Sequence, residues 1–305
     1  MDWFVFAFLS AVLLSFYQIL RKKALKFETV MDYLALYSLL CFLMLLPFVS
    51  KVNFDLSLFA FVMIFLKSVV ACLGFIFTTK AYKSFPVSTV APLLLLTPLV
   101  FLGISSFYLK EPVKMIHLLG IFLLIFGTYI LELDHTNSGK GFRNRAKHLL
   151  SPLQVFKKGY FHYIIFAVIF FSISITFDKV MLNPEIIGLN MAGLAPFTLM
   201  FFFRFFAVII FVSVLFFIHG SISEMWQGFG KSYYWIIFAA IAFNLADLFY
   251  YNAMSIAFAA LVIPVKRLSV LFTTLIGGEL FHESNIIPKS MATAIMIGGV
   301  AIICL

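Results

Sequence analysis

The chain has 305 residues, of which 63% are hydrophobic and only 11% are charged. Soluble domains carry about 25% charged residues, so the composition excludes a soluble protein and indicates a polytopic membrane protein. The net charge of +9 does not indicate a nucleic-acid partner, because most Lys and Arg residues lie in short segments between apolar runs, where they influence orientation. The three cysteines lack disulfide or metal-binding spacing, and no cofactor or metal site is predicted.

Apolar runs, taken in chain order, predict ten transmembrane helices of about 18–28 residues each. Helices are expected because backbone polar groups within lipid must be satisfied inside the span. The expected fold class is therefore an all-α membrane protein. The predicted spans are residues 3–20, 30–49, 58–79, 85–108, 115–133, 160–177, 191–218, 233–252, 256–280 and 287–304.

One polar segment, residues 134–159, interrupts this pattern after the fifth span. It carries six Lys and Arg residues together with several Gly, Ser and Asn residues, a composition typical of a linker. The chain is therefore expected to consist of two five-helix halves, residues 1–133 and residues 160–305.

The two halves resemble each other. Residues 78–133 align with residues 250–305 without a gap, and 11 of the 56 positions are identical. Because apolar sequences match by chance, the informative identities are those of less common residue types. These are Pro92 with Pro264, Glu111 with Glu283, and Gly127 with Gly299. An odd number of spans in each half predicts inverted repeats, an architecture of secondary transporters with a binding site near the midplane.

A family resemblance follows from these segments. The run "KAYKSFPVSTVAPLLLLTPLVFLGISSFYLKEPVKMIHLLGIFLLIFGTYIL" resembles the EamA-type repeat of the drug/metabolite transporter superfamily. In that repeat a helix with small residues and Pro runs to a Glu, and a Gly-containing last helix follows. The second half repeats the pattern with "IPVKRLSVLFTTLIGGELFHES" and "IMIGGVAIIC". The resemblance implies a ten-helix secondary transporter whose central cavity is lined mostly by helices 1, 3, 4, 6, 8 and 9.

Four basic residues, Lys67, Arg204, Lys266 and Arg267, lie near the centres of predicted spans. A charge at that depth costs about 2.5–3.5 kcal/mol on insertion scales. The pair Lys266 and Arg267 is similar to a Lys-Arg pair in helix 9 of the plastid phosphate translocators of the same superfamily, where the pair binds a phosphate group. The functional interpretation is an anion site. In the structural alternative, Asp247 neutralises one cation and the others snorkel or bond carbonyls.

Two predicted spans carry polar stripes. In span 8 the stripe has the spacing of one helix face and consists of Asn244, Asp247 and Tyr251. Span 1 has a similar row of Ser10, Tyr17 and Arg21, with Gln18 adjacent. Such stripes face bundle interiors or water-filled cavities, so they can bind substrate or form hydrogen bonds between helices. Asp247 could also carry a proton.

Several other residues have structural interpretations. Glu111 and Glu283 precede predicted spans and are expected to stabilise helix N-termini. Pro92 and Pro264 are expected to kink spans 4 and 9. The pairs Gly277-Gly278 and Gly298-Gly299 are expected to allow close contact between helices.

The orientation in the membrane is left open by the sequence. Odd-numbered loops contain 13 Lys and Arg residues and even-numbered loops contain four, which places both termini outside the cytoplasm. The family resemblance implies both termini inside. The two termini are expected to share a side.

The leading functional hypothesis is a secondary transporter of a small organic metabolite, favouring an anionic group, in the plasma or inner membrane. No ATP-binding motif is present, so a coupling proton or an exchanged metabolite would supply the energy. Alternatives are a carrier of neutral or zwitterionic compounds such as amino acids or drugs, a channel, or a membrane-embedded enzyme; the enzyme is disfavoured because no catalytic motif is found. The candidate substrate-binding residues are Lys266, Arg267, Lys67, Arg204, Asn244, Asp247, Tyr251, Tyr17 and Gln18.

Overall fold

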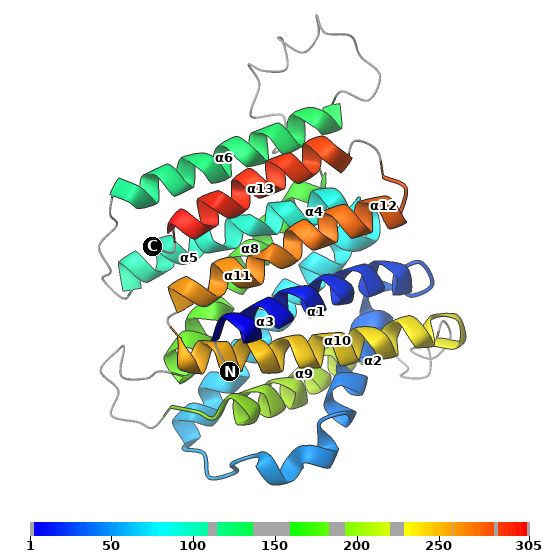
Figure 1. The fold of residues 1–305 in the computed structure, drawn as a ribbon. Coiled ribbons are helices and arrows are strands. Elements are labelled where there is room, and N and C mark those ends of the chain that lie inside the picture. The colour runs from blue at the N-terminus through cyan, green and yellow to red at the C-terminus, as the bar shows by residue number, and fades with distance from the viewer. Residues whose placement is uncertain are drawn as a thin grey trace, which may run out of the picture.

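A computed structural model describes residues 3–108, 115–136, 159–182, 193–219, 229–257, 259–283 and 286–303. Within these ranges every regular element is a helix (Figure 1). Residues 137–158 of the central linker and Glu111 lie outside the described residues. The all-α prediction is therefore confirmed for the part of the chain that the structure describes.

The first half contains α1 (Trp3–Ala24), α2 (Val30–Leu43), α3 (Leu58–Ser84), α4 (Val87–Leu93), α5 (Thr97–Tyr108) and α6 (Met115–Thr136). The second half contains α8 (Gly159–Leu182), α9 (Pro196–His219), α10 (Phe229–Ile256), α11 (Ala259–Phe272), α12 (Gly278–Leu280) and α13 (Ile286–Ile303). Each predicted span thus contains helix. The largest difference is in the span expected at 30–49, because α2 ends at Leu43 and a 3-10 helix, η1 (Leu46–Lys51), follows with Pro47 in its first turn.

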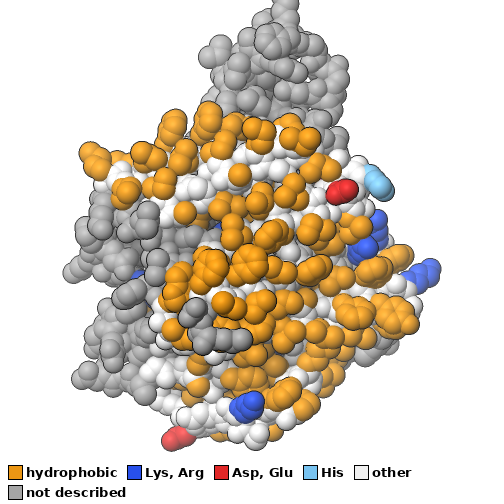
Figure 2. Space-filling model, viewed as in Figure 1, with side chains coloured by type: hydrophobic (Ala, Val, Ile, Leu, Met, Phe, Trp, Pro, Cys, Tyr) orange, Lys and Arg blue, Asp and Glu red, His pale blue; other side chains and the backbone are white. Residues whose placement is uncertain are grey.

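Five of these helices are long and apolar enough to cross a membrane. They are Trp3–Ala24, Leu58–Ser84, Phe161–Leu182, Pro196–Ile218 and Gly230–Ile256. Shorter apolar helices accompany them at Val30–Leu43, Val87–Phe101 and Ile286–Ile302. The side chains on the face shown in Figure 2 are mostly apolar, and the few visible charged side chains lie mainly near its edges. A multi-pass integral membrane protein follows from these lengths and this surface.

Proline changes the helix geometry differently in the two repeats. α4 contains Pro92 and gives way at Leu94 to a single 3-10 turn, η2 (Leu94–Leu96), before α5 begins at Thr97. The Thr97 hydroxyl donates to the Leu94 carbonyl over 2.7 Å, and the Thr97 backbone N–H donates to the same carbonyl, so this carbonyl is satisfied within the 3-10 turn. In contrast, α11 runs through Pro264 without interruption, and the irregular segment is a π-helix, η7 (Thr273–Gly277), farther along.

The helices form a bundle with α6 and α13 side by side at one edge and α2 and α9 at the opposite edge (Figure 1). α1 lies in the interior and packs most extensively on α10, while α3 packs on α8. α1 begins and α13 ends toward the same end of the bundle, on the left of Figure 1. This placement is the one expected of termini that share a side.

Glycines allow α6 and α13 to approach closely. A Cβ at Gly127 would lie 2.4 Å from Met296 and 3.0 Å from the Ala292 carbonyl oxygen. A Cβ at Gly299 would lie 2.8 Å from the Gly120 carbonyl oxygen and 3.0 Å from the Leu124 backbone nitrogen. Under the sequence offset that aligns the two halves, these contacts are equivalent to each other: 127 corresponds to 299, 120 to 292, and 124 to 296.

The glycines of the two adjacent pairs, Gly277-Gly278 and Gly298-Gly299, differ in how closely neighbouring residues approach them. Close contact is found at Gly299, but a Cβ at Gly298 would meet nothing within 4 Å. At Gly277 a Cβ would come within 3.1 Å of Val87, and at Gly278 within 3.2 Å of Ile286. The expected role in close packing therefore applies to three of these four glycines.

Candidate substrate-binding cavity

A central cavity of about 170 Å³ lies among α1, α3, α8, α10 and α11, with the η2 region and α9 completing its wall. These helices include all those that the family resemblance implies, and Phe203 adds α9 to them. Seven of the nine predicted site residues line this one space. They are Tyr17, Gln18, Lys67, Asp247, Tyr251, Lys266 and Arg267.

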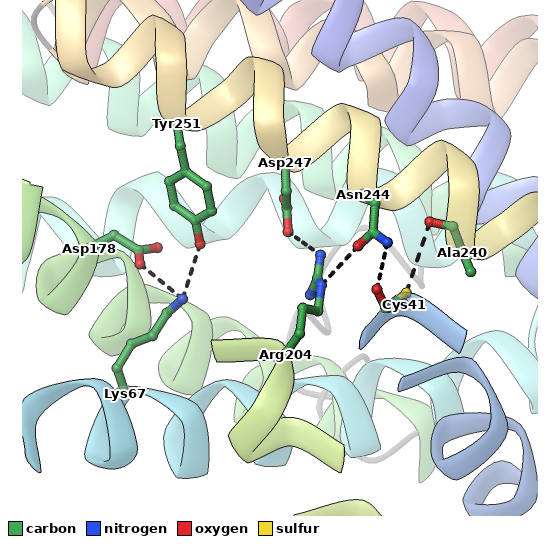
Figure 3. Close-up of polar contacts among 8 residues, drawn as sticks. All are labelled: Cys41, Lys67, Asp178, Arg204, Ala240, Asn244, Asp247 and Tyr251. Atoms are coloured by element: carbon green, nitrogen blue, oxygen red, sulfur yellow. Dashed lines mark hydrogen bonds and ion pairs between the residues drawn. The ribbon is translucent and has the colours of Figure 1, made fainter. Parts of the chain in front are cut away.

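Lys67 forms the centre of one polar network (Figure 3). Its ammonium lies 3.0 Å from the Asp178 carboxylate and donates to the Tyr251 hydroxyl over 3.0 Å. The same ammonium lies 3.7 Å from the centre of the Phe203 ring. Lys67 is only 2% exposed, so this buried charge is compensated by a carboxylate, a hydroxyl and a ring face from three other helices.

Arg204 forms a second network beside the first (Figure 3). Its guanidinium donates to Asp247 over 2.7 Å and to the Asn244 side-chain oxygen over 3.1 Å. Asn244 in turn donates to the Cys41 carbonyl over 2.9 Å. Arg204 and Asn244 are not among the described residues that line the cavity; they lie behind Asp247, which does. The structural alternative for Asp247 is therefore realised, with Arg204 as the cation that it neutralises.

We call Lys67, Asp178, Arg204 and Asp247 the paired cluster. Lys67, Arg204 and Asp247 lie about 5–7 Å from the middle of their helices at 1.5 Å per residue. α3 and α9 begin, and α10 ends, at the end of the bundle where α1 begins (Figure 1). All three residues are therefore displaced toward that end. Asp178 shares this level because α8 continues to Leu182, beyond the predicted end at residue 177.

Lys266 and Arg267 form a second feature, which we call the α11 pair. Both side chains line the cavity. The Lys266 ammonium lies 3.3 Å from the centre of the Tyr250 ring, which gives it an electrostatic contact with the ring face. The pair therefore adds two positive charges to the cavity wall from α11, a helix that carries no member of the paired cluster.

The charge balance of the cavity is positive. Its wall carries four cations, Arg21, Lys67, Lys266 and Arg267, and two carboxylates, Asp178 and Asp247. Arg204 stands behind the wall as a fifth cation, bonded to Asp247. Even with Arg267 left out of the count, four cations against two carboxylates leave a surplus of two positive charges among the described residues at this site.

Arg21 and Asp178 are the charged cavity residues, among those that the structure describes, that the sequence did not select as site candidates. Arg21 shows why. Span 1 was predicted to end at residue 20, whereas α1 continues to Ala24 and keeps Arg21 inside the bundle. The sequence feature that could have identified Arg21 as a site residue is its position in the polar row that also contains Tyr17. The spacing of four residues brings the two side chains together on one helix face, with a long contact of 3.4 Å between the guanidinium and the Tyr17 hydroxyl.

Glu283 binds a helix N-terminus, but of a helix in the other half of the chain. Its carboxylate accepts the backbone N–H of Val87 over 2.7 Å and that of Ser88 over 3.0 Å. The Ser88 hydroxyl also donates to Glu283, and Lys289 donates to that hydroxyl over 3.0 Å. Glu283 was expected to act on a helix N-terminus, and the structure identifies that helix as α4, which it ties to the segment between α12 and α13.

The fold and the cavity define a multi-pass helical membrane protein with a buried, positively charged polar site. Residues 1–133 match the EamA-like transporter family, so the EamA-type repeat predicted for this half is confirmed, and the match indicates a membrane transporter of small molecules. No curated protein matches the chain.

A crystal structure with 16% sequence identity has a similar fold, with a TM-score of 0.55 and coverage of 96% of each chain. At this identity the similarity shows the fold alone.

Proposed function

We propose that the chain is a secondary carrier of a small organic anion, with its substrate bound in the central cavity. The observation that carries this proposal is the surplus of two positive charges that remains at a buried site even with Arg267 left out of the count. Buried charges are costly unless compensated, so a wall that keeps this surplus favours an anionic ligand. Lys266 and Arg267 would bind the anionic group, with Arg offering a planar fork and Lys a compact charge.

The proposed transport cycle is alternating access between two inverted five-helix repeats with ten spans in total. The reciprocal glycine contacts of α6 and α13 support this architecture, because they relate the two halves by a local two-fold arrangement. The cavity lies between helices of both halves, where inverted-repeat carriers bind substrate. Glu283 ties α4 to the second half at one end, which would hold that end closed in this conformation.

Aromatic side chains in the cavity wall favour a second candidate, a carrier of zwitterionic or neutral compounds such as amino acids. Phe75, Phe171, Phe203 and Phe243 contribute rings to the wall, and Asp178 or Asp247 could accept an ammonium group by exchanging partners. In that case neutral and zwitterionic compounds would stabilise the protein more than anions do.

Thermal unfolding of the purified protein against matched anionic and neutral compounds tests the proposal. A ligand at 100 times its Kd raises stability by about 2.7 kcal/mol, and only anions are expected to do so. Counterflow in proteoliposomes should then show saturable exchange of the stabilising anion.

Lys266→Gln and Arg267→Gln should each weaken anion binding about 10- to 100-fold, the result of losing a charge-assisted bond. Lys80→Gln is the matched control. The Lys80 ammonium lies 6.0 Å from the ring centres of Phe77 and Tyr163, and Lys80 does not line the cavity. Stabilisation by neutral compounds only, or equal effects of the cavity and control variants, would contradict an anion carrier.

A further inference from the structure

Arg21 is a buried cation of the cavity wall that the anion site on α11 does not use. The residue is 2% exposed and lines the cavity. The centre of its guanidinium lies 4.1 Å from the Tyr82 ring centroid and 4.9 Å from that of Tyr17. Both rings contact the guanidinium as cation–π partners, which leaves its N–H edge to bind an acceptor.

Hydrogen-bonding capacity at this position exceeds what the described residues use. The Arg21 Nε atom has no hydrogen-bond partner within the described part of the chain. The same holds for the hydroxyls of Tyr33 and Tyr37, which are buried on the neighbouring helix α2. The Tyr82 hydroxyl donates to Gln18 over 2.9 Å. Tyr33, Tyr37 and Tyr82 do not line the cavity. Among the described residues no carboxylate forms an ion pair with Arg21, so at this position the cavity wall offers the Arg21 Nε–H to an acceptor that the described residues do not supply.

Arg21 is separated from the α11 pair along the bundle axis. The Tyr17 ring packs 4.5 Å from the Phe243 ring, and the Phe6 and Phe249 rings lie 5.9 Å apart. These contacts show that α1 and α10 are antiparallel. Arg21 therefore lies four residues from the Tyr17–Phe243 contact in one direction along the bundle axis. Tyr250 lies seven residues from the same contact in the opposite direction.

At 1.5 Å per residue, the eleven steps counted from the Tyr17–Phe243 contact and the sixteen counted from the Phe6–Phe249 contact place the Arg21 backbone about 16–24 Å from the level of Tyr250, where the Lys266 ammonium lies. Helix side chains lean toward the N-terminus of their helix, which directs Arg21 back along α1 toward the cavity. The charged groups are then about 10–19 Å apart.

We propose that the cavity binds an elongated dianion, with one anionic group at Lys266 and Arg267 and the other at Arg21. This inference rests on the anion-carrier function proposed above and specifies its substrate class. An extended four- or five-carbon dicarboxylate spans about 6–7 Å between its outer oxygens, and a hydrogen bond of about 2.8 Å at each end extends this to about 12 Å. Two anionic groups would also balance the surplus of two positive charges.

The planar fork of Arg21 suits a carboxylate or a phosphate equally. The shared chemistry is a small molecule with an anionic group at each end, either a dicarboxylate or a phosphorylated carboxylic acid. A substrate with a single anionic group would bind at only one of the two positions, either at Lys266 and Arg267 or at Arg21.

Counterflow in proteoliposomes with three probes tests the proposal: succinate, 3-phosphonopropionate, and succinamate, in which a neutral amide replaces one carboxylate of succinate. The wild-type protein should prefer at least one of the two dianions over succinamate by about 10- to 100-fold, the effect of one charge-assisted bond. The preferred dianion also shows whether the second anionic group of the substrate is a carboxylate or a phosphate-like group. Arg21→Gln should bring the affinity for that dianion close to the affinity for succinamate.

Lys23→Gln is the matched control. It removes one positive charge two residues along the same helix, from a side chain that contacts the Trp235 ring and is not part of the cavity wall; it should preserve the preference. Arg21→Lys keeps the charge but not the fork, and it should lower the dianion preference without abolishing it. This variant decides the question if Arg21→Gln does not fold.

The dianion site would be overturned if the Arg21 variants kept the dianion preference unchanged. It would also be overturned if the wild-type protein carried succinamate as well as the dianions. Either result would leave the proposed anion carrier intact. Failure of the wild-type protein to carry or bind any anion would instead remove the proposed function itself.

Discussion

Two parts of the cavity wall handle charge in different ways. In the paired cluster each cation has a carboxylate from another helix, with Arg204 at 2.7 Å from Asp247 and Lys67 at 3.0 Å from Asp178. In the α11 pair, Lys266 and Arg267 face a cavity whose two described carboxylates already bind those other cations. The comparison separates charges that hold helices together from charges that we infer to bind a ligand.

The largest expected effect is the loss of one partner in the paired cluster. Asp247→Asn leaves the Arg204 guanidinium buried without its carboxylate, and breaking a buried pair in this way costs about 3–5 kcal/mol. The double variant Asp247→Asn with Arg204→Gln should recover much of that loss, because no isolated charge remains. Unfolding of the detergent-solubilised protein measures both.

Asp55→Asn serves as the control for this series. Asp55 is exposed before α3, so its replacement should change stability by less than about 0.5 kcal/mol. If the double variant were as unstable as Asp247→Asn alone, the ion pair would not explain the loss, and the distinction between the two parts of the wall would fail.

The α11 pair should show the opposite pattern. Lys266→Gln removes a charge from a positive environment, so the ligand-free protein should lose little stability or gain up to about 1 kcal/mol. Stabilisation by an anion should fall by about 1.5–3 kcal/mol, since a charge-assisted bond is lost. The difference between unfolding curves with and without ligand measures this. A large loss of ligand-free stability would place Lys266 among the structural charges instead.

The sequence predicts the spans and the buried cations well, because apolar runs and the charges within them are visible directly. The pairing is not visible. Any of Lys67, Arg204, Lys266 and Arg267 could have bound Asp247, and the choice depends on the rotation of each helix, which changes by about 100° per residue. Asp178 lies one residue beyond the predicted span 160–177, and only the longer α8 brings it to the level of Lys67.

Residues at span boundaries were the other source of error. Arg21 lies one position beyond the predicted first span, but α1 continues past it and buries it against two tyrosines. Glu283 precedes α13 in sequence, which suggested that helix as its target. Tertiary packing instead brings the N-terminus of α4 to it. Helix ends are the least reliable part of a sequence-based assignment, and both residues lie at such ends.

A smaller loss of stability is expected when the Tyr251 hydroxyl is removed. Lys67 donates to this hydroxyl in addition to its ion pair with Asp178. Tyr251→Phe keeps the ring and removes one charge-assisted bond of 3.0 Å, which should cost about 1.5–3 kcal/mol. Asp178 still neutralises Lys67 in this variant, so the loss should stay below that of Asp247→Asn. A loss as large as that of Asp247→Asn would show that the hydroxyl, and not the ion pair, dominates this network.

The smallest effect is expected where a cation of the α11 pair contacts an aromatic ring. The Lys266 ammonium lies 3.3 Å from the Tyr250 ring centre, and a cation–π contact of this kind is worth about 0.5–2 kcal/mol. Tyr250→Phe keeps the ring face and should leave anion affinity within about twofold of wild type, whereas Tyr250→Leu removes it and should weaken binding about 3- to 10-fold. Binding titrations of the two variants against one anion measure the difference. Equal affinities would mean that the ring does not position Lys266, and a loss in both variants would assign the effect to the hydroxyl. Because Tyr250 lies beside Tyr251 on α10, adjacent residues of one helix then serve the two parts of the wall: Tyr251 stabilises a cation that is already paired, and Tyr250 holds one that we infer to bind the substrate.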